Sequence, residues 1–208
     1  MKQQILLIGG GGHCKSCIDV IEQEGKYQIA GIVDPKEKQG HTILGYPVIG
    51  TDDDLPQLIS QYKNALITVG QIKSANIRIR LYQYLKELKA ELPVIISPLA
   101  YVSKHAQVQE GTIIMHHAII NAEVNIGVNN IINSKALIEH EVEIGNHCHI
   151  STKATVNGQV KIGNEAFIGS GATLSNNINL SDKVIVPAGE TVFKNITKPG
   201  IHIRSVGR

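Results

Sequence analysis

The stretch "IGVNNIINSKALIEHEVEIGNHCHI", residues 126–150, decides the fold because it places isoleucine at every sixth position. The same register runs from Val102 to Val192 and holds Ile, Val or Leu at all 16 positions, although these three types make up only 27 of the 91 residues in that range. A period of six is neither that of an α-helix nor that of an alternating strand. It is typical of a solenoid built from hexapeptides.

The hexads predict a prism of stacked coils. Each hexad is expected to form one short strand and one corner, so that three hexads make an 18-residue coil and the 15 intervals make five coils. The aliphatic residue and a mostly small residue four positions later are expected to point inward and fill the prism. Asn130 is the polar exception among the small positions, and we expect it to be a hydrogen-bonded core amide.

The first 97 residues predict a separate α/β domain. Expected strands are 5–8, 29–33, 47–49, 65–69 and 93–96, and expected helices are 13–24, 53–62 and 75–88. Their alternation predicts a small parallel sheet. The expected domains are therefore residues 1–97 and 98–208.

A glycine turn at Gly9–Gly12, between the first strand and the first helix, indicates a phosphate site. Backbone N–H groups at a helix N-terminus bind phosphate, and Asp34, at the end of the second strand, is placed to bind a ribose hydroxyl. The third glycine of the dinucleotide fingerprint is missing, because the run continues with His13 and Cys14. A single nucleoside diphosphate therefore fits better than a dinucleotide. The alternative is that these glycines form only a tight turn.

The order of motifs resembles a known family. "GGGGHCK" (9–15), "VDP" (33–35), "ITVG" (67–70), the prism and "INSKALIEHE" (132–141) together resemble the hexapeptide-repeat sugar O- and N-acyltransferases of bacterial surface glycan and glycoprotein synthesis. The resemblance is strongest to UDP-amino-sugar N-acetyltransferases of the bacillosamine type, and sialic-acid O-acetyltransferases and perosamine N-acetyltransferases share the layout.

This resemblance implies a fold and a reaction. The fold is a Rossmann-like parallel sheet domain followed by a left-handed parallel β-helix, assembled as a homotrimer with active sites between subunits. The reaction moves acetyl from acetyl-CoA directly to the amine of a nucleotide-linked 4-amino-4,6-dideoxy sugar, with UDP as the expected nucleotide and no metal required.

The resemblance also assigns site residues. The catalytic base falls on His140, with Glu141 beside it. The nucleotide sugar is expected at Gly11, Gly12, His13, Lys15, Asp34, Gly70, Arg78 and Asn133, and a second histidine of the family matches His149. We expect acetyl-CoA at His149 and, apart from the resemblance, at Gly158, Ser170 and Ala188. The end of the chain departs from the family, because "KPGIHIRSVGR" (198–208) lacks the Pro-Ala that many members carry near the pantetheine.

The six-residue register independently favours His140. It comes two residues after Ile138 and is expected at a corner, pointing outward, together with Glu141. One coil further along the same corner lies Gly158, whose backbone stays open to a ligand. Histidine titrates near neutrality and can act as a base, and a neighbouring carboxylate fixes its tautomer. The alternative is that His140 is an ordinary turn residue.

Several other interpretations compete with this one. The register sends His140, His147 and His149 to different corners and faces, which argues against a zinc site. Cys14 and Cys17 have the spacing of a redox pair, but helical periodicity places Cys17 on the core face. Three consecutive aspartates at 52–54 precede a predicted helix, where capping accounts for them.

Bulk composition sets the remaining bounds. The chain has 208 residues, 20 basic and 18 acidic side chains and a net charge of +2, which argues against nucleic acid as the main partner. Three cysteines give no disulfide framework, and no apolar run approaches the ~18 residues of a membrane span, so we expect a cytoplasmic protein without membrane insertion. Two other functions stay open: an O-acetyltransferase for a sialic-acid-type sugar, and a non-catalytic nucleotide-sugar-binding assembly.

Overall fold

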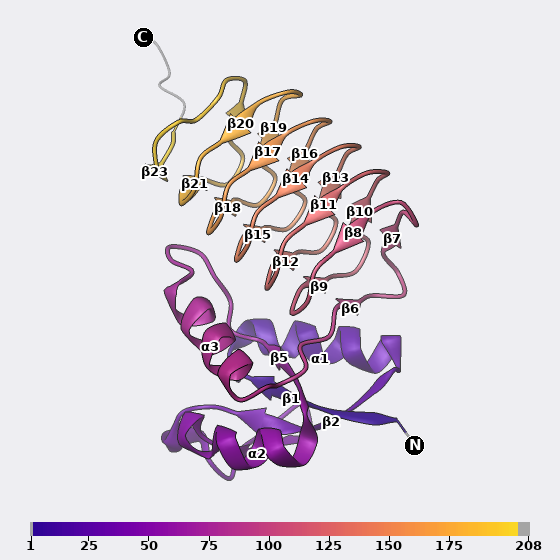
Figure 1. The fold of residues 1–208 in the computed structure, drawn as a ribbon, viewed down its shortest axis with the longest axis vertical. Coiled ribbons are helices and arrows are strands. Elements are labelled where there is room, and N and C mark those ends of the chain that lie inside the picture. The colour runs from indigo at the N-terminus through magenta and orange to yellow at the C-terminus, as the bar shows by residue number, and fades with distance from the viewer. Residues whose placement is uncertain (1, 204–208) are drawn as a thin grey trace.

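A computed structural model describes residues 2–203 of the chain and shows a triangular prism of short strands standing on a small α/β domain (Figure 1). The sheet of the α/β domain has the strand order β3-β4-β2-β1-β5. Its strands are β1 (Gln3–Ile8), β2 (Tyr27–Val33), β3 (Thr42–Ile43), β4 (Tyr46–Gly50) and β5 (Asn64–Ile67). All neighbours run parallel except the short edge strand β3, which is antiparallel to β4 and was not expected from the sequence.

Three helices cover this sheet: α1 (Gly12–Glu24), α2 (Leu55–Tyr62) and α3 (Asn76–Glu87). The side chains of β1 alternate between two cores, so that Ile5 and Leu7 join the core that includes α1 while Leu6 and Ile8 join the core that includes α2 and α3. The capping expected for the aspartates is present, because Asp54 Oδ2 accepts hydrogen bonds from the Thr51 N–H (2.8 Å) and hydroxyl (3.0 Å).

The prism has three faces, each a parallel sheet. The face that we call the docking face contains β6 (Ile95–Ile96), β9 (Ile113–Ile114), β12 (Ile131–Ile132), β15 (His149–Ile150), β18 (Phe167–Ile168), β21 (Val184–Val186) and β23 (Gly200–Ile201). The uncharged face contains β7 (Tyr101–Val102), β10 (Ile119–Ile120), β13 (Leu137–Ile138), β16 (Thr155–Val156), β19 (Thr173–Leu174) and β22 (Thr191–Val192). The polar face contains β8 (Gln107–Val108), β11 (Asn125–Ile126), β14 (Glu143–Ile144), β17 (Lys161–Ile162) and β20 (Asn179–Leu180).

Strands pair with strands one 18-residue coil away, as the period predicts. Ile120 pairs with Ile138, and Ile138 pairs with Val156. The aliphatic positions of the register form one continuous core along the prism together with the small positions. Asn130 is fully buried, and its amide donates to the carbonyl oxygens of Gly127 (2.8 Å) and Gly145 (2.9 Å), which confirms the expected core amide.

The corners depend on a backbone conformation that the sequence analysis did not identify. Every sixth residue from Gly111 to Gly189 has a positive φ, between 54° and 74°. Eleven of these 14 residues are not glycine, although the left-handed region costs other residues ~1 kcal/mol each. Each coil offsets part of this cost through a hydrogen bond to the coil before it, as in Glu141 N–H to the carbonyl oxygen of Ala122 (3.0 Å).

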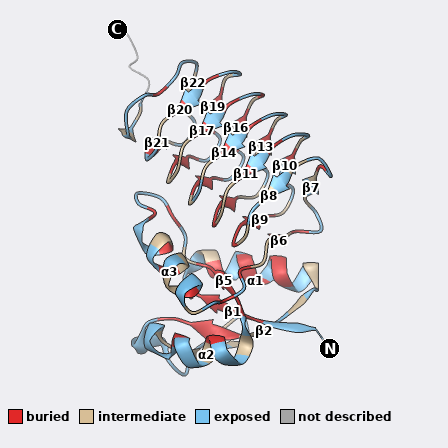
Figure 2. Cartoon of the chain, in the orientation of Figure 1, coloured by how far each residue is buried: buried red, intermediate tan, exposed pale blue. Residues whose placement is uncertain are grey.

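One expected strand belongs to a different sheet. Residues 93–96 were expected to complete the α/β sheet, but β6 pairs with β9 and is the first strand of the prism. The outward side chains of Ile95, Ile113 and Ile131 pack into the same core as α1, so an apolar contact joins the domains. Figure 2 shows this contact as buried strands of the docking face that lie next to α1.

Among the helices of residues 2–203, none combines the length and the apolar character that crossing a bilayer requires.

Candidate active site

The glycine turn is divided into a packed half and an open half. Gly9 has φ +106° and lies against Val69, and a Cβ on Gly10 would lie 2.6 Å from Asp34 Oδ2, so neither position has room for a side chain. Gly11 and Gly12 have no atoms within 4 Å of their Cβ positions. Gly11 is the N-cap of α1, and the first turn of the helix carries no acidic residue. This exposed helix N-terminus can bind an anion.

Asp34 lies beside the turn, as the sequence predicted. Its Oδ1 accepts a hydrogen bond from the Gly10 N–H (3.0 Å), and its Oδ2 lies 2.6 Å from Lys38 Nζ. The carboxylate therefore stabilises the turn, while Lys15 lies exposed on the first turn of α1.

His13 and Gly70 meet where the ends of β1 and β5 approach each other. A Cβ on Gly70 would lie 3.6 Å from His13 Cβ. The Nε2 atom of His13 is buried without a hydrogen-bond partner among residues 2–203. Burial, with smaller contributions from the nearby Arg78 and His149, lowers the pKa of His13 to about 3, so the imidazole is neutral at physiological pH.

Arg78 is not placed to bind a ligand directly. Its side chain is 1% exposed. The guanidinium donates to the carbonyl oxygens of Ile67 (2.9 Å), Val69 (2.8 Å) and Asn129 (3.1 Å). The expected contact between Arg78 and the nucleotide sugar is therefore replaced by contacts within the protein.

His149 and Asn133 lie together at the docking face, beside the loop that follows β5. The His149 Nδ1–H donates to the carbonyl oxygen of Gln71, which can only accept, so Nε2 is left as the acceptor facing Asn133 Nδ2 (3.2 Å). Burial is the main reason that the pKa of His149 falls to about 4. Gln71 also donates to the carbonyl oxygen of His147 (2.9 Å). The sequence analysis missed Gln71, whose only signal is its position after Gly70.

His140 and Glu141 form a pair at a corner of the prism, between β13 and β14. The His140 side chain is 56% exposed, and its Nδ1 lies 2.9 Å from Glu141 Oε2. Gln159 Nε2 lies 3.2 Å from both oxygens of the same carboxylate. The hydrogen bond from His140, followed by that from Gln159, lowers the pKa of Glu141. Because the carboxylate accepts from Nδ1–H, the lone pair of His140 is on Nε2, where it can take a proton.

Gly158 lies one coil further along this corner, as the period predicted. A Cβ on Gly158 would lie 2.7 Å from both Cε1 and Nε2 of His140. Because Gly158 has no side chain, the His140 imidazole can occupy this space.

Within the chain, these residues form three separate groups. His140, Glu141 and Gly158 lie at the corner between the uncharged and polar faces, which is the corner opposite the docking face. Ser170 and Ala188 are exposed at the corner between the docking and uncharged faces. Ser170 Oγ lies 2.9 Å from Ser151 Oγ. The residues predicted to bind the nucleotide sugar lie in the α/β domain or, like Asn133, on the docking-face side.

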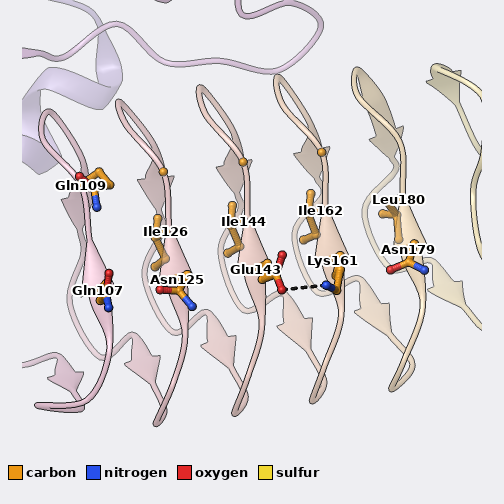
Figure 3. A pocket seen from close by; sticks show the side chains of 13 residues that line it. Gln107, Gln109, Asn125, Ile126, Glu143, Ile144, Lys161, Ile162, Asn179 and Leu180 are labelled. Carbon is orange, nitrogen blue, oxygen red and sulfur yellow. Dashed lines mark ion pairs between the residues drawn. The ribbon is translucent and has the colours of Figure 1, made fainter.

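The polar face has a shallow hollow that contains none of the predicted site residues (Figure 3). Its volume is ≈ 760 Å³, and an ion pair between Glu143 and Lys161 (2.8 Å) crosses it. Within the described part of the chain, no three His, Cys, Asp or Glu side chains are arranged to hold a metal ion. Cys14 and Cys17 are buried, and burial raises the pKa of both thiols.

Comparison with known proteins gives matches to both domains. The family model "PglD N-terminal domain" matches residues 4–85, and the model "Bacterial transferase hexapeptide (six repeats)" matches residues 141–176. A comparison with curated protein sequences gave no match.

Solved structures match nearly the whole chain. PerB from Caulobacter crescentus, in complex with CoA and GDP-perosamine, is 30% identical, with a TM-score of 0.88 over 95% of this chain and 92% of that chain. The acetyltransferase domain of PglB from Neisseria gonorrhoeae is 28% identical, with a TM-score of 0.86 over 96% of both chains. A histidine-to-asparagine variant of perosamine N-acetyltransferase from Caulobacter crescentus, in complex with the same two ligands, is 29% identical, with a TM-score of 0.89 over 97% of this chain and 94% of that chain.

The two domains and their order are those of these acetyltransferases over nearly the whole chain. This chain belongs to the hexapeptide-repeat sugar acyltransferases, the family that the sequence resembled.

Proposed function

We propose that the protein is an acetyl-CoA-dependent sugar N-acetyltransferase that acts on the amine of a nucleotide-linked 4-amino-4,6-dideoxy sugar. The observation that carries this proposal is the pair of His140 and Glu141, with the imidazole seated in the space that Gly158 leaves, in a chain 30% identical to a protein solved with CoA and GDP-perosamine. The open backbone of Gly11 and Gly12 supports a diphosphate at the N-terminus of α1. UDP is the first candidate for the nucleotide, and GDP is the second.

His140 acts as the general base. The carboxylate of Glu141 holds Nδ1–H, which leaves Nε2 to take a proton from the attacking amine. The nitrogen forms a bond to the acetyl carbon, and the carbon–sulfur bond of acetyl-CoA breaks. The proton held by His140 passes to the departing sulfur, so the transfer is direct and atoms balance without an acyl-enzyme.

The complete site requires more than one subunit. His140 lies opposite the docking face, whereas the glycine turn lies in the domain that covers this face. A homotrimer with the uncharged faces around its axis would bring the His140 corner of one subunit beside the Ser170 corner of the next. The uncharged face suits this role because it exposes Tyr101 (58%) and Ile119 (41%), apolar surface that a second copy would bury.

CoA release from acetyl-CoA, measured with a thiol reagent, tests this function. The panel contains UDP-, GDP- and CMP-linked amino sugars, and the enzyme is compared with the His140→Ala variant. We expect one 4-amino sugar to be acetylated and the variant to lose ~10²–10⁴-fold in rate. If no amino sugar is acetylated, the N-acetyltransferase assignment is wrong. Equal rates for the two proteins with an accepted sugar would show that His140 is not the base.

A further inference from the structure

Arg78 is a buried cation without a carboxylate partner. Within residues 2–203, no Asp or Glu side chain lies within ion-pair distance of its guanidinium, although the side chain is only 1% exposed. Burial lowers the pKa of Arg78 to about 10, so the group stays charged at neutral pH. Burying a charge is costly, and here only carbonyl and side-chain amide oxygens stabilise it.

The guanidinium joins the nucleotide domain to the prism. On one side, Nη1 donates to the carbonyl oxygens of Ile67 (2.9 Å) and Val69 (2.8 Å), at the end of β5. On the other side, Nη2 donates to the carbonyl and side-chain oxygens of Asn129, a fully buried corner residue with φ 54°. One planar group therefore fixes the end of β5 relative to a corner of the prism.

The segment that Arg78 holds is also attached to the glycine turn. Thr68, which lies between the two carbonyls that Arg78 binds, donates from its hydroxyl to the carbonyl oxygen of Gly9 (2.6 Å). Gly9 itself packs against Val69. A shift of the segment after β5 would therefore move the turn that we propose to hold the diphosphate.

The same segment continues to the prism on its other side. Gly70 follows Val69, and Gln71 then binds both histidines at the docking face: its amide donates to the His147 carbonyl oxygen (2.9 Å), and its carbonyl oxygen accepts from His149. Asn129 Nδ2 lies 3.0 Å from His147 Nδ1, which closes the network.

We propose that Arg78 is a positioning residue that holds the segment 67–71 in register with the prism, so that the sugar of the bound nucleotide is presented to the catalytic corner at a fixed position. This inference rests on the proposed function, because it requires a nucleotide sugar at the glycine turn. Arg78 touches neither substrate, and its effect passes through Val69, Gly70 and Gln71.

Two variants and one control test this role. Arg78→Lys keeps the charge but loses the planar fork, and Asn129→Gly removes the side-chain acceptor while suiting the positive φ of the corner. Asp19→Asn is the control, because it weakens a different polar contact between the domains, Asp19 Oδ2 to His116 Nε2 (2.7 Å), away from this segment. The steady-state KM is measured separately for the nucleotide sugar accepted by the wild type and for acetyl-CoA.

We expect Arg78→Lys and Asn129→Gly to raise the KM for the nucleotide sugar or lower kcat by at least ~10-fold, since a misplacement of ~1 Å can cost ~10²-fold in rate. The KM for acetyl-CoA should stay within about twofold of the wild-type value in both variants. Asp19→Asn should change neither of the two KM values nor kcat. Guanidinium ion at millimolar concentration should restore part of the activity of Arg78→Ala.

The outcomes separate the two proposals. If the wild type accepts no nucleotide sugar, the proposed function is overturned and this inference with it. If the wild type is active and folded Arg78→Lys and Asn129→Gly proteins have wild-type constants, only the positioning role is overturned. An equal rise in the KM for both substrates, with no rescue of Arg78→Ala by guanidinium, would also overturn it, because these results indicate a general loss of structure.

Discussion

The position of the His140 imidazole depends on Gly158, the residue one coil further along the same corner. A methyl group at Gly158 would lie 2.7 Å from the imidazole, which must then move away from the place where Glu141 holds it. Because the backbone of Gly158 has no positive φ, alanine fits the chain itself. We expect Gly158→Ala to lower kcat at least ~10-fold with little change in the melting temperature.

Gly163→Ala is the matched comparison for this prediction. Its Cβ would lie 2.6 Å from the Asp182 backbone nitrogen and 2.7 Å from the Ser181 carbonyl carbon, away from His140. This variant should lower the melting temperature, because backbone atoms cannot move aside as a side chain can. Unchanged kcat in Gly158→Ala would contradict the idea that the glycine makes space for His140.

Two histidines with lowered pKa values, His13 and His149, should make the protein sensitive to acid. His149 has a pKa lowered to about 4 and His13 one lowered to about 3, against an ordinary value near 6.5. At pH values between the ordinary pKa and the lowered ones, the unfolded chain binds protons that the folded chain does not. The free energy of unfolding therefore falls as the pH drops from ~6.5 toward 4.

Urea unfolding as a function of pH measures this effect. We expect His149→Asn, which keeps a donor for the Gln71 carbonyl oxygen, to flatten the dependence by up to ~3 kcal/mol over this range. The exposed His105 provides the control, since His105→Asn should leave the curve unchanged. A His149→Asn curve with the wild-type slope would show that burial does not perturb this group.

At single positions, the six-residue register predicted which side chains point into or out of the prism and which residues lie one coil apart. The register placed His140 outside, Asn130 inside and Gly158 one coil from His140, because each conclusion needs only a count along the chain. It could not predict the burial of Arg78 or the contact from Gln71 to His149, since both depend on how the α/β domain packs against the prism.

At the level of elements, the left-handed corners are the costly part of the repeat. Lys153 occupies such a corner with φ 60° and its side chain is exposed. A β-branched residue is a genuine outlier at positive φ. We expect Lys153→Val to lower the free energy of unfolding by ~1–2 kcal/mol and Lys153→Gly to leave it equal or higher, both measured by urea denaturation.

The same change on a strand separates backbone from side-chain effects. Lys161 is exposed in β17 on the polar face, where valine is well suited to the extended backbone. Lys161→Val loses an exposed ion pair with Glu143, which is worth less than ~1 kcal/mol. A larger loss for Lys161→Val than for Lys153→Val would contradict the view that corner conformation limits the sequence.

The strand at Ile95–Ile96 shows why element prediction stops where domains meet. Its apolar, β-branched residues fit either sheet, and local pattern does not say which partner they pair with. The side chain of Ile95 serves both domains, since it extends the prism face and enters the core that contains α1. Only the packing of the two domains decides the pairing.

At the scale of the whole molecule, the separation of the glycine turn from His140 leads to a prediction about assembly. If each site takes its glycine turn from one subunit and His140 from the next, two inactive variants can complement each other. Gly12→Glu should block the proposed diphosphate site with a negative charge that the N-terminus of α1 tolerates. His140→Ala removes the proposed base and leaves the α/β domain intact.

Co-expression of these two variants in equal amounts should restore activity. A site works only when its α/β domain comes from a His140→Ala subunit and its base from a Gly12→Glu subunit, so random trimers should have about a quarter of the wild-type rate. If each site lay within one subunit, this mixture would stay inactive. Co-expression of wild type with the double variant provides the second measurement, because it should also give about a quarter for shared sites but about half for sites within one subunit.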